Sequence, residues 1–421
     1  MEERRLDGGG AAGAAPRRSL VEWVEPEPPP AWASTPARTL AECREPFERH
    51  EDALTLGLEE EVMLLDPSTL ELSPSVEAAL QLLHGDPRYV RELRSAQLEI
   101  VTRPAPDVHR AACDLAKARL TLAERLEPGL RFAAAGTHPW STDWGDLPEG
   151  ERYEAIAIEY PSAPEQALPC GMHVHVAVPG ADRALAVYNA LRSYLPELAA
   201  LAANAPFFEG ADTGLASVRP GLMRGMLRVG VPPAFATWDD LASYVSWGRR
   251  GGLFPDASHL WWLLRLHLGL GTLELRVFDA QTRVQDAAAI AGVCQALVAD
   301  LVRRHDAGER LAVHDTHRIA ENDWRANRYG VRGFLVDLDT GSRIPTRERL
   351  AALLERLGPA AEPLGAGDAL LAAATLVADA GADRQRYVAA EQGLDGLVGW
   401  LVRETRASAA ELLAGETVVT G

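Results

Sequence analysis

Glutamate, histidine and arginine side chains recur two residues apart in several short segments of the chain. The pairs are Glu59 and Glu61, Gln97 and Glu99, His173 and His175, and Glu274 and Arg276. Carboxylates with some histidine suit Mg²⁺ or Mn²⁺, because hard cations prefer oxygen ligands. An arginine among them suits phosphate, which its guanidinium group can hold with two hydrogen bonds. Together the pairs indicate a site for metal and nucleotide.

Apolar residues alternate with these polar pairs, which indicates that each pair lies on a strand. Residues two apart on a strand point to the same face, so the polar pairs oppose the apolar positions. We predict strands over 54–65, 93–101, 171–178 and 272–278. If these strands share a sheet, their polar faces form a floor of carboxylate, imidazole and guanidinium groups. Such dense like charge repels unless cations neutralise it.

Each pair has an ordinary explanation when it is considered alone. The acidic pair on the first strand could lie on a solvated face. His173 and His175 could be structural, or they could bind zinc. Glu274 and Arg276 could form a cross-strand ion pair. The occurrence of all the patterns in one chain favours a metal and nucleotide site over these separate explanations.

The remaining pattern indicates the elements that position these strands. Helical periodicity predicts helices over 108–126, 183–203 and 286–302. Residues 204–256 are rich in Gly and Pro and predict long loops, and the chain after about residue 345 reads as helical. Short strands with uneven connections favour an antiparallel-rich α+β fold over a doubly wound sheet.

Composition separates the first part of the chain from the rest. Residues 1–48 are rich in Gly and Pro, which predicts a flexible leader. We expect residues 49–421 to form a single catalytic domain, with a helical C-terminal part over about 345–421.

Charge and cysteine usage restrict the partners. The 421 residues include 42 basic and 60 acidic side chains, a net charge of −18, which argues against nucleic acid or an anionic membrane surface as a partner. The four cysteines show no CxxC spacing, so a disulfide framework and a structural zinc site are not expected. The N-terminus does not resemble a signal peptide, and we expect no transmembrane helix. These features predict a cytoplasmic protein that acts on small molecules.

Several motifs, in order along the chain, resemble the carboxylate–amine ligase (YbdK-like) branch of the glutamate–cysteine ligase type 2 family. The strand motifs are Gly-Leu-Glu-Glu-Glu over 57–61, Cys-Gly-Met-His-Val-His-Val over 170–176 and Gly-Thr-Leu-Glu-Leu-Arg-Val over 271–277. Further matches are Gly-Thr-His-Pro over 136–139, Ala-Asn-Ala-Pro-Phe over 203–207, Gly-Ala-Asp-Thr-Gly over 210–214 and Glu-Asn-Asp-Trp-Arg-Ala over 321–326. The resemblance extends from about residue 55 to residue 335.

The resemblance implies a fold and a reaction. The implied fold is that of the glutamine synthetase and guanidino kinase catalytic domains, an antiparallel sheet flanked by helices. The implied reaction uses ATP to phosphorylate a carboxylate, typically the γ-carboxylate of glutamate, and an amine then attacks the acyl phosphate to give an amide. ATP with Mg²⁺, or Mn²⁺ in its place, is the implied cofactor.

The resemblance also implies roles for individual residues. Metal ligands are expected at Glu59, Glu61, Glu92, Glu99, His173 and Glu274. Contacts with the nucleotide are expected from Arg276, Glu59 and His175. Catalytic roles are expected for Arg276, Glu61 and Glu274.

The substrates are less constrained, because the chain departs from the family at one motif. Where the family has a W-D-x-R-P-like stretch, residues 262–266 read Trp-Leu-Leu-Arg-Leu, so leucines replace a carboxylate and a proline. A leucine in place of the acid would weaken recognition of an α-amino group. We expect glutamate or an analogue as the acid, cysteine or another amine as its partner, and a homo-oligomer as one arrangement of the chain. The predicted substrate-binding residues are Arg219, Arg265, Asn322 and Arg325.

Two other functions stay open at this point. A zinc-dependent hydrolase would use His173 and His175, with His138 as the only plausible further histidine ligand. A non-catalytic relative would bind nucleotide and regulate a partner. The intact acidic and arginine positions argue against this second alternative.

Overall fold

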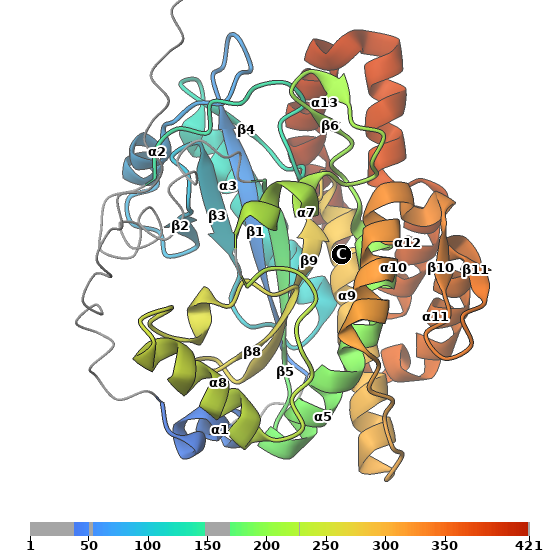
Figure 1. The fold of residues 1–421 in the computed structure, drawn as a ribbon. Helices are drawn as coiled ribbons and strands as arrows, with labels where there is room; N and C mark the ends of the chain where they lie inside the picture. The colour runs from blue at the N-terminus through green and yellow to red at the C-terminus, as the bar shows by residue number, and fades with distance from the viewer. Residues whose placement is uncertain (1–37, 50–53, 148–168, 227, 420–421) are drawn as a thin grey trace, which may run out of the picture.

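A mostly antiparallel sheet organises the protein, which is described here from a computed structural model covering residues 38–49, 54–147, 169–226 and 228–419 (Figure 1). Within these ranges seven strands form one sheet in the order β2-β3-β1-β5-β9-β8, with β4 also pairing with β1, and every pair is antiparallel. The strands are β1 (Leu56–Leu65), β2 (Tyr89–Arg91), β3 (Gln97–Val101), β4 (Arg131–Ala133), β5 (Gly171–Ala177), β8 (Leu264–His267) and β9 (Thr272–Asp279). The expected α+β fold with an antiparallel sheet is confirmed.

The register of the sheet aligns the polar pairs that the sequence separates. Glu59 lies opposite His173 in the β1–β5 pair, and Glu61 lies opposite Glu99 in the β1–β3 pair. His175 lies opposite Glu274 in the β5–β9 pair. The prediction that the four segments share one sheet and one polar face is therefore confirmed.

Two long helices cover the apolar face of the sheet, α3 (Val108–Leu126) and α9 (Val284–Asp306), and they lie behind it in Figure 1. The periodicity-based prediction gave the bounds of α3 correctly. Helix α9 is long and apolar enough to cross a membrane, but 89% of its most apolar window is buried inside the protein. It is therefore the central core helix of this fold.

One charged residue breaks the apolar pattern of β1. Glu60 shares its face with the leucines of the strand and is fully buried. Its carboxylate accepts two hydrogen bonds from Arg119 of α3, Nε to Oε2 at 2.8 Å and Nη2 to Oε1 at 2.5 Å. Arg119 also donates to the carbonyl oxygens of Gln281, Thr282 and Thr405. This ion pair beneath the sheet was not predicted from the sequence.

A proline divides the helix predicted over 183–203. The observed elements are α5 (Ala181–Leu191), a 3₁₀ turn over Arg192–Tyr194, and α6 (Leu195–Ala202). Pro196 lies in the first turn of α6, where its missing N–H costs nothing, and a continuous helix through this position would lose a hydrogen bond.

Two predictions of irregular structure were wrong. Residues 204–256 contain α7 (Arg219–Leu222) and α8 (Trp238–Arg250), and α8 begins with a capping box between Thr237 and Asp240. The predicted leader extended to residue 48, but α1 (Leu40–Glu48) is a helix capped by Thr39, with Cys43 and Phe47 in the core. The rest of that prediction falls on residues 1–37, which lie outside the described residues.

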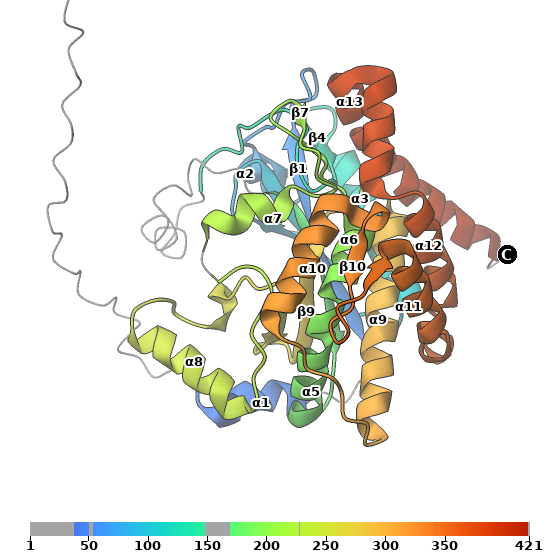
Figure 2. The ribbon, with the colours of Figure 1, turned by 45° about the vertical axis from the view of Figure 1, so that its right-hand side comes forward.

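Helices from the last third of the chain pack beside the sheet, as Figure 2 shows. Helix α10 (Thr316–Tyr329) packs against α6 and against the small hairpin of β10 (Phe334–Val336) and β11 (Arg343–Pro345). The chain ends in α11 (Thr346–Ala361), α12 (Gly367–Ala378) and α13 (Gly381–Val419), the last with a kink at Gly393.

Candidate functional site

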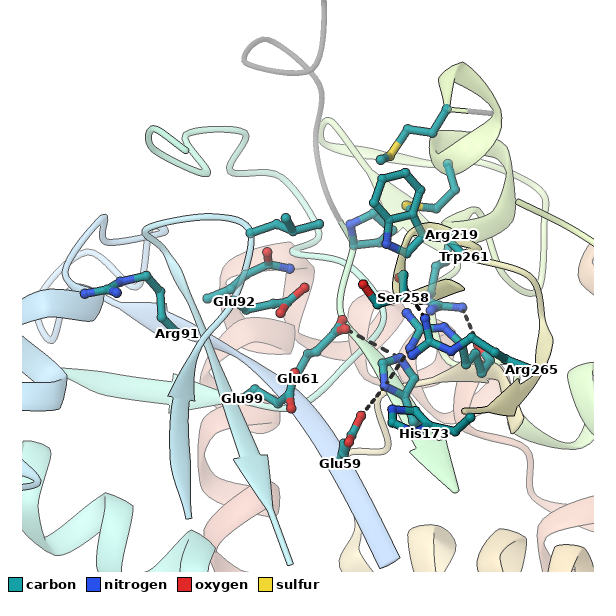
Figure 3. Close-up of a pocket in the computed structure, with 17 residues that line it drawn as sticks. Glu59, Glu61, Arg91, Glu92, Glu99, His173, Arg219, Ser258, Trp261 and Arg265 are labelled. Carbon is teal, nitrogen blue, oxygen red and sulfur yellow. Dashed lines mark hydrogen bonds and ion pairs between the residues drawn. The ribbon is translucent and has the colours of Figure 1, made fainter. Parts of the chain in front are cut away.

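The polar face of the sheet forms the floor of a cavity of about 300 Å³. Figure 3 shows its acidic residues on one side, together with Arg91, and Arg219, Arg265 and Trp261 on the other. Its lining includes Glu59, Glu61, Glu92, Glu99, His173, Arg219, Trp261, Arg265 and Arg276.

Three carboxylates converge at the acidic side of this cavity. Glu61 comes from β1, Glu92 from the end of β2 and Glu99 from β3, and one oxygen of each lies within 4.8 Å of the others. Burial and the neighbouring carboxylates raise the pKa of Glu99 well above its usual value. A hard divalent cation would remove this repulsion and find three oxygen ligands, so the cluster fits Mg²⁺.

Glu59 and two histidines form a second group beside the carboxylates. Nδ1 of His173 donates to Glu59 Oε2 at 2.8 Å, and Nε2 of His175 lies 3.2 Å from Glu59 Oε1. Burial opposes the charge of Glu59, but the hydrogen bond from His173 and the close contact with His175 outweigh it and lower the pKa of this carboxylate. Glu59 is therefore ionised at neutral pH.

His173 is oriented as a metal ligand would be. Its Nδ1–H is used by Glu59, so Nε2 carries the lone pair, and Nε2 has no hydrogen-bond partner among the described residues. Burial first, and then the positive charge of Arg276, lower the pKa of His173 and favour the neutral ring. Nε2 lies 3.6 Å from Glu61 Oε1, between the two acidic groups.

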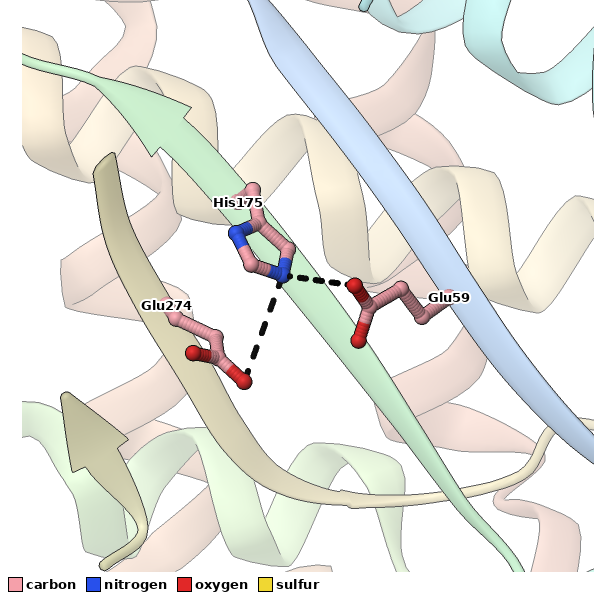
Figure 4. A group of neighbouring side chains, drawn as sticks. All are labelled: Glu59, His175 and Glu274. Atoms are coloured by element: carbon pink, nitrogen blue, oxygen red, sulfur yellow. Dashed lines mark ion pairs between the residues drawn. The ribbon is translucent and has the colours of Figure 1, made fainter. Parts of the chain in front are cut away.

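Glu274 lies beyond His175, and Figure 4 shows it with His175 and Glu59. These three residues also offer ligand atoms within 4.8 Å of one another. However, Glu274 accepts hydrogen bonds from Arg265 at 2.7 and 2.9 Å and from Arg276 at 2.5 Å. Burial opposes its charge, but Arg276 and Arg265 lower its pKa. Glu274 therefore holds the arginines in place, and the carboxylates of Glu61, Glu92 and Glu99 fit a cation better.

Arg219 and Arg276 form the wall opposite the carboxylates. Arg219 Nη1 lies 3.4 Å from the carbonyl oxygen of Arg276, and Arg276 Nη1 lies 3.3 Å from His173 Nδ1. The Arg219 guanidinium lies against Gly171, where a Cβ atom would come within 2.4 Å of Nη2. The Gly171 amide also donates to Glu61 Oε2 at 2.5 Å, so this glycine positions both walls of the cavity.

A second cavity, of about 450 Å³, lies on the other side of this wall. It shares Arg219, Met223, Trp261 and Arg276 with the first cavity. The rest of its lining comes mainly from α7, from residues 229–231 and from α10, with Leu215, Ser217, Arg224 and Leu263. Arg219 and Arg276 therefore line both cavities.

The structure separates the predicted substrate-binding residues. Arg219 and Arg265 line the first cavity, and Arg219 also lines the second. Asn322 and Arg325 line neither of these two cavities, because both face the β10 hairpin. The Asn322 amide pairs with the backbone of Val336, and Arg325 stacks 3.6 Å above the Phe334 ring. Their side chains hold the hairpin, and we assign them no role in binding.

Three residues were not predicted from the sequence: Trp261 and Asp323, which line the cavities, and Gly171, which lies against Arg219. Gly171 and Asp323 lie inside motifs that carried the family resemblance, but these motifs did not indicate a role for either residue. Trp261 had no comparable signal, because its motif begins one residue later.

His138 is not a third zinc ligand. Backbone amides of Trp140 and Ser141 donate to its Nδ1, and its Nε2–H donates to the Leu70 carbonyl oxygen at 2.9 Å. Burial lowers the pKa of His138 to about 4. Both ring nitrogens are therefore used in backbone contacts, so His138 is not available as a zinc ligand. The further histidine that the structure brings to the first cavity is His267, whose ring centroid lies 5.5 Å from that of His175.

Comparison with known proteins supports one family over most of the chain. The family described as glutamate–cysteine ligase family 2 matches residues 55–404. A Rubrobacter xylanophilus protein provisionally named glutamate–cysteine ligase 2-1 is 35% identical over 88% of this chain and 98% of its own length. A Thermobifida fusca protein with the corresponding provisional name is 34% identical over 84% of this chain and 92% of its own length.

Solved structures show the same fold at much lower identity. A glutamate–cysteine ligase from Francisella tularensis in complex with AMP superimposes with a TM-score of 0.61 and 12% identity, covering 88% of this chain and 94% of that one. A bifunctional glutathione synthetase from Pasteurella multocida gives a TM-score of 0.59 and 14% identity, covering 89% of this chain and 54% of that one.

Proposed function

Since this chain belongs to the glutamate–cysteine ligase family 2, we propose that it is an ATP-dependent carboxylate–amine ligase that forms an amide through an acyl phosphate. In the first step, a carboxylate oxygen of the acid bonds to the γ-phosphorus of ATP, and ADP leaves. In the second step, the nitrogen of a neutral amine bonds to the acyl carbon, phosphate leaves with the C–O bonding electrons, and the nitrogen loses a proton.

One observation carries this proposal. Three converging carboxylates face two arginines across a cavity of about 300 Å³, which is the arrangement that phosphoryl transfer requires. Glu61, Glu92 and Glu99 would hold Mg²⁺, with Glu59 and His173 as adjacent ligands. Mg²⁺ bound there would neutralise the charge of the phosphates as it develops.

The arginines contribute a fixed positive charge. Arg276 would contact the transferring phosphoryl group, and Glu274 together with Arg265 keeps its guanidinium in place. His175, next to Glu59, would support the nucleotide side of the cavity. We propose glutamate or an analogue as the acid, cysteine or another amine as its partner, and the cytoplasm as the location.

The test is ADP and phosphate release from ATP and Mg²⁺ with a panel of acids and amines, added singly and in pairs, with products read by mass spectrometry. We expect ADP formation that needs both partners and a product mass equal to acid plus amine minus water. ATP binding without turnover for every pair would instead favour the regulatory relative. Tight stoichiometric zinc without ATP use would favour the hydrolase.

A further inference from the structure

The second cavity contains a buried carboxylate that the ligase chemistry described above does not use. Asp323 lines this cavity from α10, and its Oδ1 atom is buried without a hydrogen-bond partner in the described part of the chain. The side-chain amide of Asn327, one turn later, donates to the backbone carbonyl of Asp323 at 2.8 Å and also lowers the pKa of the carboxyl group, but Oδ1 is left without a partner. A buried carboxylate without a donor is costly, which points to a ligand that supplies one.

Positive charge also lies in this cavity, and two of its arginines, Arg224 and Arg219, are close enough to lower the pKa of Asp323. Arg224 and Arg328 line it in addition to the shared Arg219 and Arg276. A carboxylate and several guanidinium groups in one cavity match a ligand that carries both an ammonium and a carboxylate group.

The body of the cavity is apolar. Trp261, Leu263, Val229, Val231 and Leu215 line it, and its volume of about 450 Å³ lies within the range of small-molecule sites. A side chain as small as that of cysteine would leave much of this apolar surface unfilled. Leucine- or phenylalanine-sized side chains would cover it.

The position of the cavity agrees with the second step of the proposed reaction. None of Glu61, Glu92 and Glu99 lines it, whereas Arg219 and Arg276 line both chambers. An amine held there can reach an acyl phosphate formed at these arginines without entering the space of the metal and the phosphates.

We propose that the second cavity binds the amine substrate as an α-amino acid with an apolar side chain larger than that of cysteine, and that Asp323 pairs with its ammonium group. This inference rests on the proposed ligase function for the role of the ligand, but its test by binding does not require turnover. Burial raises the pKa of Asp323 to about 7, and an ammonium group beside it would lower that pKa and favour the carboxylate.

The test is calorimetric titration of the full chain with L-leucine and L-phenylalanine and with their analogues that lack the amino group, 4-methylpentanoate and 3-phenylpropanoate. We expect the amino acids to bind at least tenfold more tightly than the analogues and L-cysteine to bind more weakly than L-leucine. In Asp323→Asn the amino acids should bind at most about twofold more tightly than the analogues without the amino group. The matched control, Glu321→Gln, removes an exposed carboxylate from the same helix outside the cavity and should keep the full advantage.

A second variant keeps the proposal testable if Asp323→Asn does not fold. Val231→Phe narrows the cavity and should weaken L-phenylalanine binding at least tenfold while L-leucine binding changes less. Equal binding of amino acids and analogues to the wild type, or an unchanged advantage in Asp323→Asn, would overturn the proposal. In turnover assays, an effect of Asp323→Asn on the KM of the acid alone would assign the cavity to the acid and would also overturn it. A failure of every acid and amine pair to support ADP formation would refute the ligase function, whereas the binding results would stand.

Discussion

Gly171 on β5 leaves the space in which the guanidinium group of Arg219 lies. A Cβ atom at residue 171 would lie 2.4 Å from Nη2 of Arg219, closer than any side-chain contact allows. Since Arg219 lies between the two cavities, the absence of a side chain at Gly171 determines the position of this arginine.

Gly171→Ala should therefore displace Arg219 and lower kcat/KM at least tenfold, with the ligase assay as the measurement. Gly57→Ala is the matched control on the neighbouring strand, because its Cβ atom would meet only His175 at 4.0 Å. We expect the control to retain activity within about twofold. Similar losses in both variants would show that the space at Gly171 has no special importance.

Removal of the Glu60 carboxylate should lower the free energy of unfolding of the protein. Glu60→Gln leaves the buried guanidinium of Arg119 without its counter-ion, and breaking such a pair costs about 3–5 kcal/mol. Urea denaturation measures the free energy of unfolding. Glu77→Gln breaks the exposed pair with Arg91 and should cost less than about 1 kcal/mol, so comparable losses in the two variants would contradict the assigned role of the buried pair.

Glu99→Gln should weaken Mg²⁺ binding by at least about 10–100-fold, because that is the loss caused by removing even a residue that only supports a metal ligand. The measurement is the Mg²⁺ concentration that gives half-maximal ADP formation, and EDTA should abolish the activity of the wild type. Glu71→Gln, which removes an exposed carboxylate far from the cavities, should leave the Mg²⁺ requirement unchanged. A normal Mg²⁺ requirement in Glu99→Gln would remove Glu99 from the metal site.

Asp279 should make stability depend on pH. Burial raises its pKa to about 6, even though Asn204 and Ser217 donate to its carboxylate and Arg219 lies nearby. Between the ordinary pKa near 4 and this value the folded state binds more protons than the unfolded state, so stability falls as pH rises through the window. The wild type should lose up to about 3 kcal/mol relative to Asp279→Asn between pH 4 and pH 7. The measurement is the free energy of unfolding from urea denaturation at each pH. If the difference in this free energy between the wild type and Asp279→Asn does not change with pH, the expectation is contradicted.

The face of each strand could be predicted from sequence, but the neighbours across the sheet could not. Alternation places Glu59 and Glu61 on one face whatever the strand order. The pairing of Glu61 with Glu99, and of Glu59 with His173, depends on register, which is fixed by contacts between distant segments. For this reason the sequence predicted one acidic floor, whereas the structure shows two groups with His173 between them.

The predicted roles of residues on α10 failed for a related reason. Ala320, Asp323, Trp324 and Asn327 share one stripe of the helix and line the second cavity. Asn322 and Arg325 lie on another face, toward β10. Helical spacing separates the two faces, but only the tertiary packing decides which of them meets the ligand.

Helix α8 was missed because the Gly and Pro content of its surroundings outweighed a local start signal. Thr237 and Asp240 form its capping box, and this pattern is visible in the sequence. The helix has an apolar stripe that includes Trp238, Leu241 and Val245. A shorter window around Thr237 would have detected it.

The contacts of Arg119 have a consequence for the order in which the protein is made. Its guanidinium group joins β1 to α3, to the segment before α9 and, through the Thr405 carbonyl oxygen, to the last helix of the chain. During translation the chain emerges from its N-terminus, so the strand that bears Glu59 and Glu61 leaves the ribosome hundreds of residues before Thr405 does. The acidic strand is therefore synthesised early, but one of the contacts that hold it in place forms only when the last helix has been made. A nascent chain that stalls before this helix has β1 without the hydrogen bond between Arg119 and the Thr405 carbonyl oxygen.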